Sequence, residues 1–209
     1  MESACRRPWA DTLRAVLAGG ADCIQVREKS LADRDLLARV RAAIDIARPA
    51  GAAVVVNDRA DVALAAGADG VHVGQGDLPP GEVRRLAGDR LFVGASTHSL
   101  DEARASVAAG AHVCGVGAMF ASPTKPDVAP SGPAYLRAYL AAFPHVPHLA
   151  IGGIDAGRAA ELAALGCRGV AIGAAACAAR DPAAAVHAIR AALESPAPPA
   201  PVSALAPAP

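Results

Sequence analysis

The sequence has few aromatic side chains, no excess of charge and no long apolar run. Aromatic residues make up 3% of the 209 positions, and 20 basic side chains balance 20 acidic ones. Without stacking side chains or a net positive field, the composition argues against a nucleic-acid-binding protein. No apolar stretch approaches the roughly 20 residues of a membrane span, and residues 1–8 contain no apolar signal-peptide core. We therefore expect a soluble, cytoplasmic protein whose anion sites are local.

The cysteines also show no pattern. Five are present, an odd number, and they are scattered without a Cys-x-x-Cys pair, so we expect free, buried thiols. The chain is 53% hydrophobic, which is enough for one sizeable core at this length but not for two domains. We expect a single domain over residues 1–194, followed by a disordered tail at 195–209 that is rich in proline and alanine.

Short apolar runs alternate with longer alanine- and leucine-rich stretches of helical spacing. The apolar runs are hydrophobic at successive positions, which is typical of parallel strands covered on both faces. Strands are expected at residues 23–26, 53–56, 70–73, 91–95, 112–117, 149–152 and 169–172. Helices are expected at residues 10–18, 33–47, 61–66, 80–86, 100–109, 133–142, 156–165 and 182–193. Glycine-containing junctions end most helices and lead into the next strand.

Seven βα units predict an α/β fold of the TIM (β/α)8 type that lacks its first strand. The helix at 10–18 has no strand before it. An open Rossmann sheet would carry a Gly-x-Gly-x-x-Gly turn after its first strand, and none follows residues 23–26. A missing strand leaves two sheet edges exposed. We expect a start that lies upstream; the alternatives are a second chain in the gap or an impaired protein.

Positively charged residues follow the first expected strand. Barrel enzymes hold their reactive groups at the carboxyl ends of the strands. Because alternate strand residues share a face, Gln25, Arg27 and Lys29 are expected to point inward together and cradle an anion. In the alternative interpretation, the two cations form surface ion pairs with Glu28 and Asp33.

Two carboxylates follow the next two strands. Asn57 and Asp58 end one strand, and Asp77 lies just beyond the other. Oxygen ligands of this kind suit Mg²⁺, which completes its octahedral shell with phosphate and water oxygens. Asp58 could instead cap the helix that follows. Ser96, at the end of the fourth strand, either binds phosphate or caps a helix, and His98 is more typical of a rim residue than of a catalyst.

Later loops offer hydroxyl groups, one lysine and glycines. The hydroxyl-rich loop that contains Lys125 is suited to covering the site and binding a diphosphate; the alternative is a proline-stiffened connection. Glycines follow the last two strands, where this fold usually binds phosphate, although close packing also explains single glycines. The candidates in these loops are Ser122, Pro123, Thr124, Lys125, Gly153, Gly173 and Ala174.

Six motifs, in order along residues 13–193, closely resemble those of thiamine phosphate synthase. They are Gln25-Val26-Arg27-Glu28-Lys29, Asn57-Asp58, the run from His72 to Asp77, Gly94-Ala95-Ser96, Pro123-Thr124-Lys125 and the run from Ile151 to Ile154. The resemblance implies a transferase that joins a hydroxymethylpyrimidine diphosphate to a thiazole phosphate, giving thiamine phosphate and diphosphate. It implies that diphosphate leaves first and that the thiazole nitrogen captures the resulting cation.

The resemblance also implies a role for each matching position. Asp58 and Asp77 would hold Mg²⁺, and Arg27, Lys29 and Lys125 would stabilise the departing diphosphate. The pyrimidine diphosphate would contact Gln25, Arg27, Lys29, Asn57, Ser96 and Lys125. Val26, Glu28 and Pro123, in the same motifs, would also be substrate-binding. Ser122 and Thr124 would flank both substrates, and Gly153, Gly173 and Ala174 would bind the thiazole phosphate. It leaves the oligomeric state open, a homo-oligomer included.

The chain departs from the family pattern at several positions. The opening strand is missing, Ala118 and Ala121 replace prolines, Ser122 replaces threonine, and Ala174 replaces a serine. We expect Ala174 to weaken the affinity for the thiazole phosphate, since one hydroxyl donor is lost. Two other functions remain alternatives: a thiazole tautomerase that uses His98 as acid and base, and a catalytically silent ligand-binding homologue.

Overall fold

The computed structural model describes residues 5–121 and 129–194. The expected tail at 195–209 lies outside the described residues. The same holds for four candidate site residues, namely Ser122, Pro123, Thr124 and Lys125. Among the described residues, no helix combines the length and the hydropathy needed to cross a bilayer.

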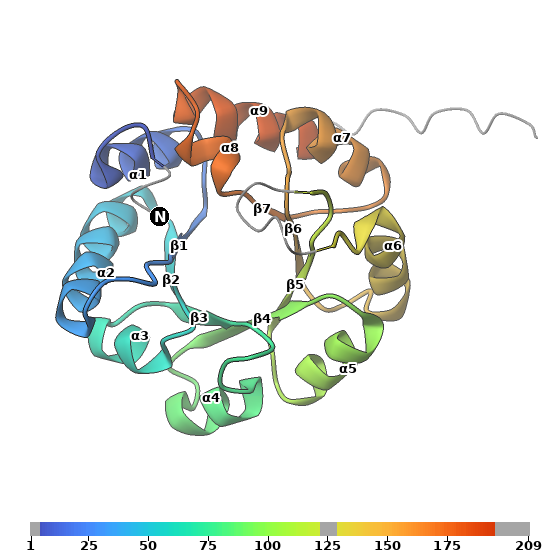
Figure 1. The fold of residues 1–209 in the computed structure, drawn as a ribbon, viewed down its shortest axis with the longest axis horizontal. Helices are drawn as coiled ribbons and strands as arrows, with labels where there is room; N and C mark the ends of the chain where they lie inside the picture. The colour runs from blue at the N-terminus through green and yellow to red at the C-terminus, as the bar shows by residue number, and fades with distance from the viewer. Residues whose placement is uncertain (1–4, 122–128, 195–209) are drawn as a thin grey trace, which may run out of the picture.

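Across the described residues, seven parallel strands lie in chain order in one curved sheet with helices around its outside (Figure 1). Each strand pairs in parallel with the next one along the chain. The strands are β1 (Cys23–Val26), β2 (Ala53–Asn57), β3 (Gly70–Val73), β4 (Phe92–Thr97), β5 (Val113–Gly117), β6 (His148–Ile151) and β7 (Val170–Ala171). The predicted α/β barrel without its first strand is confirmed.

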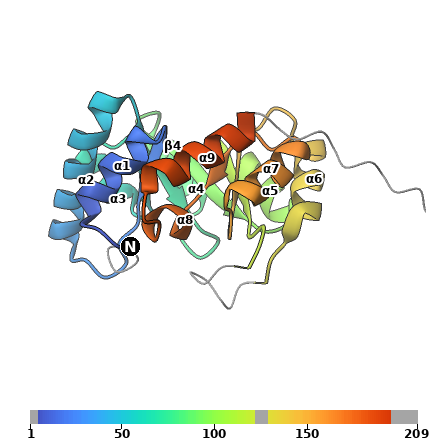
Figure 2. The same ribbon diagram turned by 90° about the horizontal axis from the view of Figure 1, so that it is seen from above.

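The helices follow the strands in regular alternation, and Figure 2 shows them from the side of the ring. Helix α2 has the predicted bounds, and the short α8 was not predicted. The helices are α1 (Trp9–Ala18), α2 (Asp33–Ala47), η2 (Arg48–Ala50), α3 (Ala60–Ala66), α4 (Pro80–Ala87), α5 (Leu100–Ala108), α6 (Gly132–Ala142), α7 (Ala156–Ala164), α8 (Ala174–Cys177) and α9 (Pro182–Glu194).

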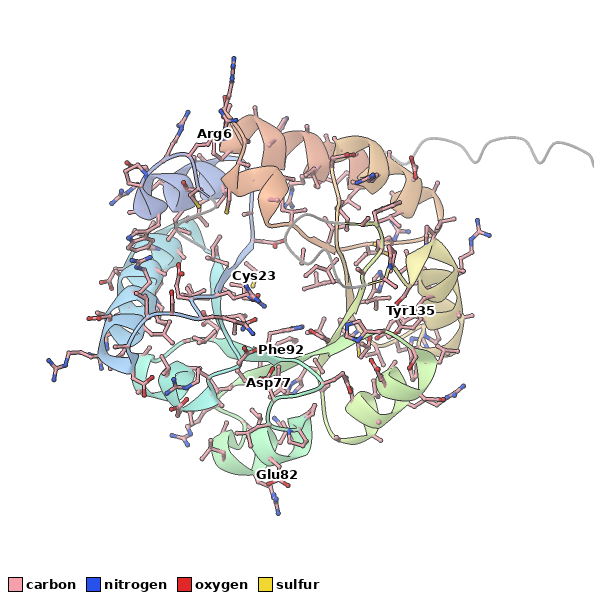
Figure 3. All side chains as sticks on the ribbon, in the orientation of Figure 1. Arg6, Cys23, Asp77, Glu82, Phe92 and Tyr135 are labelled. Carbon is pink, nitrogen blue, oxygen red and sulfur yellow. The ribbon has the colours of Figure 1, made fainter. Side chains whose placement is uncertain are left out.

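The apolar core lies mainly between the sheet and the helices, where small aliphatic side chains replace the missing aromatics. Val54 and Val56 of β2 are buried against the helices, whereas the alternate residue Val55 is only partly buried. On β1 the same alternation buries Val26 and leaves Gln25 exposed. The pleat therefore points the odd-numbered residues of β1 to the inside of the ring, where Figure 3 labels Cys23.

The prediction of buried thiols is only partly right. All five cysteines are free, and Cys114, Cys167 and Cys177 are buried. Cys23 is exposed, and Cys5 is partly so. Cys23 differs because it lies on β1, which within the described residues pairs only with β2.

The ring is closed by helices where the sheet is open. Within the described residues, β1 pairs only with β2 and β7 only with β6, so each has an unpaired edge. Across this gap α1 packs against α9, and the Arg190 guanidinium of α9 donates to the carbonyl oxygen of Gly20 at 2.8 Å. Gly19 is buried in this contact: an added Cβ would lie 2.9 Å from Val186 Cβ and collide with the Ala183 carbonyl oxygen.

We predict that Gly19→Ala destabilises the fold by about 1–3 kcal/mol, because the added methyl group forces the α1 and α9 backbones apart. Gly157→Ala is the matched control, since this glycine is exposed on α7 and its added Cβ meets only Asp155 Oδ1, at 3.5 Å. We expect the control to be neutral or to stabilise by about 0.5–1 kcal/mol, as alanine usually does in a helix. Urea unfolding measures both; equal effects would show that the α1–α9 contact is not close-packed.

Candidate active site at the carboxyl ends of the strands

The charged side chains of the loop after β1 point in two directions. Arg27 and Lys29 lie near Asp58, and Glu28 lies against helix α2. Lys29 Nζ lies 3.7 Å from Asp58 Oδ2, and the charge of Arg27 also acts on Asp58. Glu28 turns the other way, to Arg39 of α2, with 3.4 Å between Oε1 and Nη1. Of the two carboxylates in the alternative interpretation, Glu28 pairs with Arg39 and Asp33 pairs with Arg59, at 2.6 Å, whereas Lys29 pairs with Asp58.

Asp58 and Asp77 come together at one corner of the ring. Burial of Asp58 raises the pKa of its carboxyl, and the adjacent Asp77 carboxyl, within hydrogen-bonding reach, raises it further; Lys29 and Arg27 oppose the shift. Asp58 has a φ of 64°, a costly backbone conformation for a residue other than glycine. Its expected alternative role as a helix cap is wrong, because α3 is preceded by Arg59 and no side chain caps it.

The segment after β3 holds Asp77 in place. Asp77 Oδ2 accepts a hydrogen bond of 2.8 Å from the backbone N–H of Gly74, and an added Cβ on Gly74 would lie 2.9 Å from that oxygen. The Gln75 amide reaches across to β4 and donates to the carbonyl oxygen of Ser96 at 2.7 Å. Because Gly74 has no Cβ, the Asp77 carboxylate can lie close to the backbone at the end of β3.

His72 and Ser96 form a hydrogen-bonded pair on the inner face of the sheet. His72 Nε2 lies 2.9 Å from Ser96 Oγ. The imidazole lies against two glycines, since an added Cβ would be 2.5 Å from its Nδ1 at Gly94 and 3.1 Å from its Cε1 at Gly115. The expected alternative role of Ser96 as a helix cap is wrong: Ser99 caps α5, accepting from the N–H of Glu102 at 3.2 Å.

Sequence reasoning gave His72 no role of its own. Two signals mark it: a histidine between the buried valines 71 and 73, and glycines at neighbouring positions of the next two strands. Asn57, another candidate, stands beside His72 in the register of β2 and β3. The candidate residues that the structure brings together therefore come from the carboxyl ends of four neighbouring strands, β1, β2, β3 and β4.

His98 is directed to the helix layer. Its Nδ1 lies 2.9 Å from Glu102 Oε2 on α5, and 42% of its side chain is exposed. Beside it, the Tyr135 hydroxyl lies 2.7 Å from Thr97 Oγ1, and burial raises the pKa of Tyr135 to about 12. Tyr135 therefore remains protonated near neutral pH.

The glycines after β6 and β7 meet different surroundings. Gly153 has a φ of 64°, and an added Cβ would lie 2.6 Å from the carbonyl oxygen of Ala121, so close packing by itself requires glycine here. An added Cβ on Gly173 would meet no atom of the described residues within 4 Å, which leaves space among them beside the first residue of α8, Ala174. Of the two glycines at the expected phosphate-binding positions, Gly153 is crowded by neighbouring atoms and Gly173 is not.

Comparison with known proteins agrees with the geometry. The family model described as thiamine monophosphate synthase matches residues 1–176. This chain belongs to that family. The thiamine-phosphate synthase of Albidiferax ferrireducens is 44% identical over 177 residues, which are 84% of this chain and 80% of the relative. The thiamine-phosphate synthase of Moorella thermoacetica is also 44% identical, with 88% of each chain covered.

Among solved structures, thiamine phosphate pyrophosphorylase from Pyrococcus furiosus matches with a TM-score of 0.83 and 34% identity, covering 90% of each chain. The family resemblance expected from the six motifs is therefore confirmed.

We predict that Asp58→Asn stabilises the protein in metal-free buffer by up to about 1 kcal/mol, because it removes one of two adjacent negative charges. Asparagine tolerates the positive φ, so the backbone is preserved. The control is Asp61→Asn on α3, whose carboxylate lies 2.7 Å from Arg59 and whose loss is expected to cost about 0.2–1 kcal/mol. Chemical unfolding near neutral pH checks the opposite signs; a loss of stability in Asp58→Asn would contradict the like-charge contact.

Proposed function

We propose that the chain is a thiamine phosphate synthase. It joins 4-amino-2-methyl-5-hydroxymethylpyrimidine diphosphate to 4-methyl-5-(2-hydroxyethyl)thiazole phosphate and releases thiamine phosphate and diphosphate. The observation that carries the proposal is the meeting of Lys29 with the Asp58 and Asp77 carboxylates at one rim of the ring, in a chain of this family. A cytoplasmic location fits two phosphorylated, water-soluble substrates.

The reaction is a substitution in two steps. The bond between the methylene carbon and the diphosphate oxygen breaks, and its electron pair leaves with the diphosphate. The aminopyrimidine ring delocalises the positive charge that remains on the methylene carbon. The thiazole nitrogen then donates its lone pair to that carbon and forms the C–N bond. No proton moves in either step, so the protein's task is to stabilise the leaving group and to exclude water.

Arg27 and Lys29 would supply the fixed positive charge. Both act on the Asp58 corner, so a diphosphate bound there would meet cations from β1 and oxygen ligands from β2 and β3. Such preorganised charges stabilise the developing negative charge without rearranging. Lys125, which lies outside the described residues, would add a third cation. Gln25, Asn57 and Ser96 would orient the pyrimidine diphosphate through their side-chain amides and hydroxyl.

Asp58 and Asp77 would hold the magnesium ion. Their fit rests on the structure's own chemistry: two hard oxygen donors lie side by side. Burial and then the adjacent Asp77 carboxyl raise the pKa of Asp58, and a cation would compensate the negative charge of the pair. Along residues 5–121 and 129–194, no group of three or more His, Cys, Asp or Glu side chains is suited to hold a metal. Two carboxylates would leave the other positions to diphosphate and water oxygens. A bound Mg²⁺ would neutralise charge on the departing diphosphate.

The thiazole phosphate would bind at the ends of β6 and β7. The open space beside Gly173 and the backbone N–H groups after it suit a phosphate, and Gly153 lies at the end of the neighbouring strand. Ala174 provides no hydroxyl, so the backbone would supply the hydrogen bonds there. Ser122 and Thr124, outside the described residues, would complete this side.

The contacts of His98 favour the tautomerase less than the contacts of Asp58 and Asp77 favour the synthase. The imidazole of His98 bonds to Glu102 on the outer helix α5, which draws it away from the interior of the ring. A tautomerase also has no use for paired carboxylates beside two cations. The silent-homologue alternative is decided by assay alone.

We predict that the purified chain, given both substrates and Mg²⁺, forms thiamine phosphate and diphosphate in equal amounts. Chromatography of the thiamine phosphate and an enzymatic assay for diphosphate measure the two products. Isomerisation of the thiazole without diphosphate release would favour the tautomerase, and binding without any conversion would favour the silent homologue.

We predict that Arg27→Ala lowers kcat/KM by about 100-fold or more, the usual scale when a charge-stabilising donor is removed. Arg41→Ala is the control, because Arg41 is exposed on α2 and donates to the carbonyl oxygen of Ala65, away from the site. Steady-state kinetics on both variants, with unfolding curves to confirm folding, give the comparison. Equal kinetics in the two variants would contradict the role of Arg27.

We predict that Mg²⁺ with inorganic diphosphate stabilises the wild type but not Asp77→Asn. A ligand present at 100 times its dissociation constant adds about 2.7 kcal/mol of stability. Thermal unfolding with and without the two ions measures the shift. A full shift in the variant would exclude Asp77 as a ligand.

A further inference from the structure

The cationic loop after β1 contains a carboxylate that is largely, though not fully, buried on the helix side of the sheet. Glu28 lies between Arg27 and Lys29, yet only 12% of its side chain is exposed. Its partner Arg39, on α2, is 16% exposed, and the two lie 3.4 Å apart. A surface ion pair contributes little, but removing one partner of a buried pair leaves the other charge without compensation. The Glu28–Arg39 pair therefore constrains the loop more than an exposed pair would.

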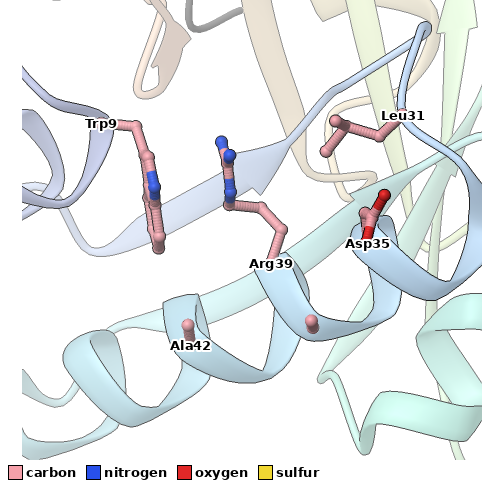
Figure 4. A pocket seen from close by; sticks show the side chains of 6 residues that line it. Trp9, Leu31, Asp35, Arg39 and Ala42 are labelled. Atoms are coloured by element: carbon pink, nitrogen blue, oxygen red, sulfur yellow. The ribbon is translucent and has the colours of Figure 1, made fainter.

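Arg39 is itself held by an aromatic ring. Its guanidinium carbon lies 4.5 Å from the centroid of the Trp9 indole, at the first residue of α1. Figure 4 shows the indole of Trp9 beside the guanidinium group of Arg39, with Asp35 nearer the N-terminus of α2. The two side chains line a hollow formed by Trp9, Leu31, Asp35, Ala38, Arg39 and Ala42. The contact ties the site loop to α2 and, through Trp9, to α1.

We propose that Glu28, Arg39 and Trp9 are positioning residues that set which way the cationic loop faces. The inference rests on the proposed function and deepens it. In extended backbone, adjacent side chains point to opposite sides, so fixing Glu28 toward the helices directs its neighbour Arg27 into the ring, and Lys29 reaches Asp58 from the bend that follows. Lys29 cannot secure this alone, because 65% of its side chain is exposed.

The arrangement also explains a glutamate within an anion-binding loop. A carboxylate between two cations would weaken a diphosphate site if it were free to turn toward them. Arg39 draws the Glu28 charge into the helix layer, and the indole of Trp9 stacks on Arg39.

The test measures binding of inorganic diphosphate with Mg²⁺ by calorimetry, and kinetics for both substrates. We expect Arg39→Met to weaken diphosphate binding and to raise the KM for the pyrimidine diphosphate by about 10-fold to 100-fold, as misplaced site groups do. The KM for the thiazole phosphate should stay within about twofold of wild type, because that substrate binds elsewhere. Arg41→Met on the same helix, directed to Ala65, should match wild type in all three measurements.

A second substitution tests whether the two residues act as a pair. In the double variant Glu28→Gln with Arg39→Met the same contact is lost, so we expect diphosphate binding to fall no further than in Arg39→Met alone. Trp9→Phe should keep the stacking and near-normal KM, whereas Trp9→Leu should raise the KM in the same direction as Arg39→Met. A merely structural role would change stability in all of these variants without a selective rise in the KM for the pyrimidine diphosphate.

Three results would overturn the proposal. The first is wild-type diphosphate binding in a folded Arg39→Met. The second is a double variant that binds diphosphate about tenfold more weakly than that single variant, which would show that the two residues do not act as a pair. The third result is equal KM values for Trp9→Leu and Trp9→Phe. It decides the question if Arg39→Met does not fold. Failure of the proposed function is a different result: wild-type protein that binds Mg²⁺ and diphosphate but forms no product. Wild-type protein that does not bind diphosphate overturns both.

Discussion

The site depends on two carboxylates being held together against their mutual repulsion. Asp58 and Asp77 come from different strands, and burial and proximity raise the pKa of Asp58 although Lys29 and Arg27 lie nearby. Asp58 also adopts a positive φ. The surrounding fold must supply the free energy for this arrangement, and parallel β pairing does so by fixing the ends of β2 and β3 side by side. A site under such strain is suited to a ligand that carries the missing positive charge.

Most of the fold is predictable from the sequence because its signals are local. Successive apolar positions identify the buried strands, and helical spacing with glycine junctions gives α2 its bounds. Helix α8 was missed because four residues are too few to show a period. The competing roles for Asp58 and Ser96 could not be decided from sequence, since capping depends on where the helix begins, and Arg59 and Ser99 precede α3 and α5.

The site was predictable where strand alternation alone determines direction. Gln25 is exposed on β1 as the alternation predicts, and Arg27 and Lys29, beyond the end of that strand, both act on Asp58. His72 was not recognised, because its role depends on space that two other strands provide through Gly94 and Gly115. The partner of Glu28 was equally hidden: Arg39 is eleven residues away and on a helix. Contacts of this kind are set by the packing of separate elements, which no short motif records.

The position of β1 at an open edge explains why the helix layer matters to the chemistry. In the described part of the chain, β1 pairs on one side only, yet it precedes both Arg27 and Lys29. A strand with one partner gains half the usual hydrogen bonds, so its orientation must be secured from outside the sheet. The contacts of Arg39 with Glu28 and Trp9 do this at the carboxyl end, and the packing of α1 on α9 closes the ring behind them. The cations of the site are therefore held as much by helix packing as by the sheet that carries them.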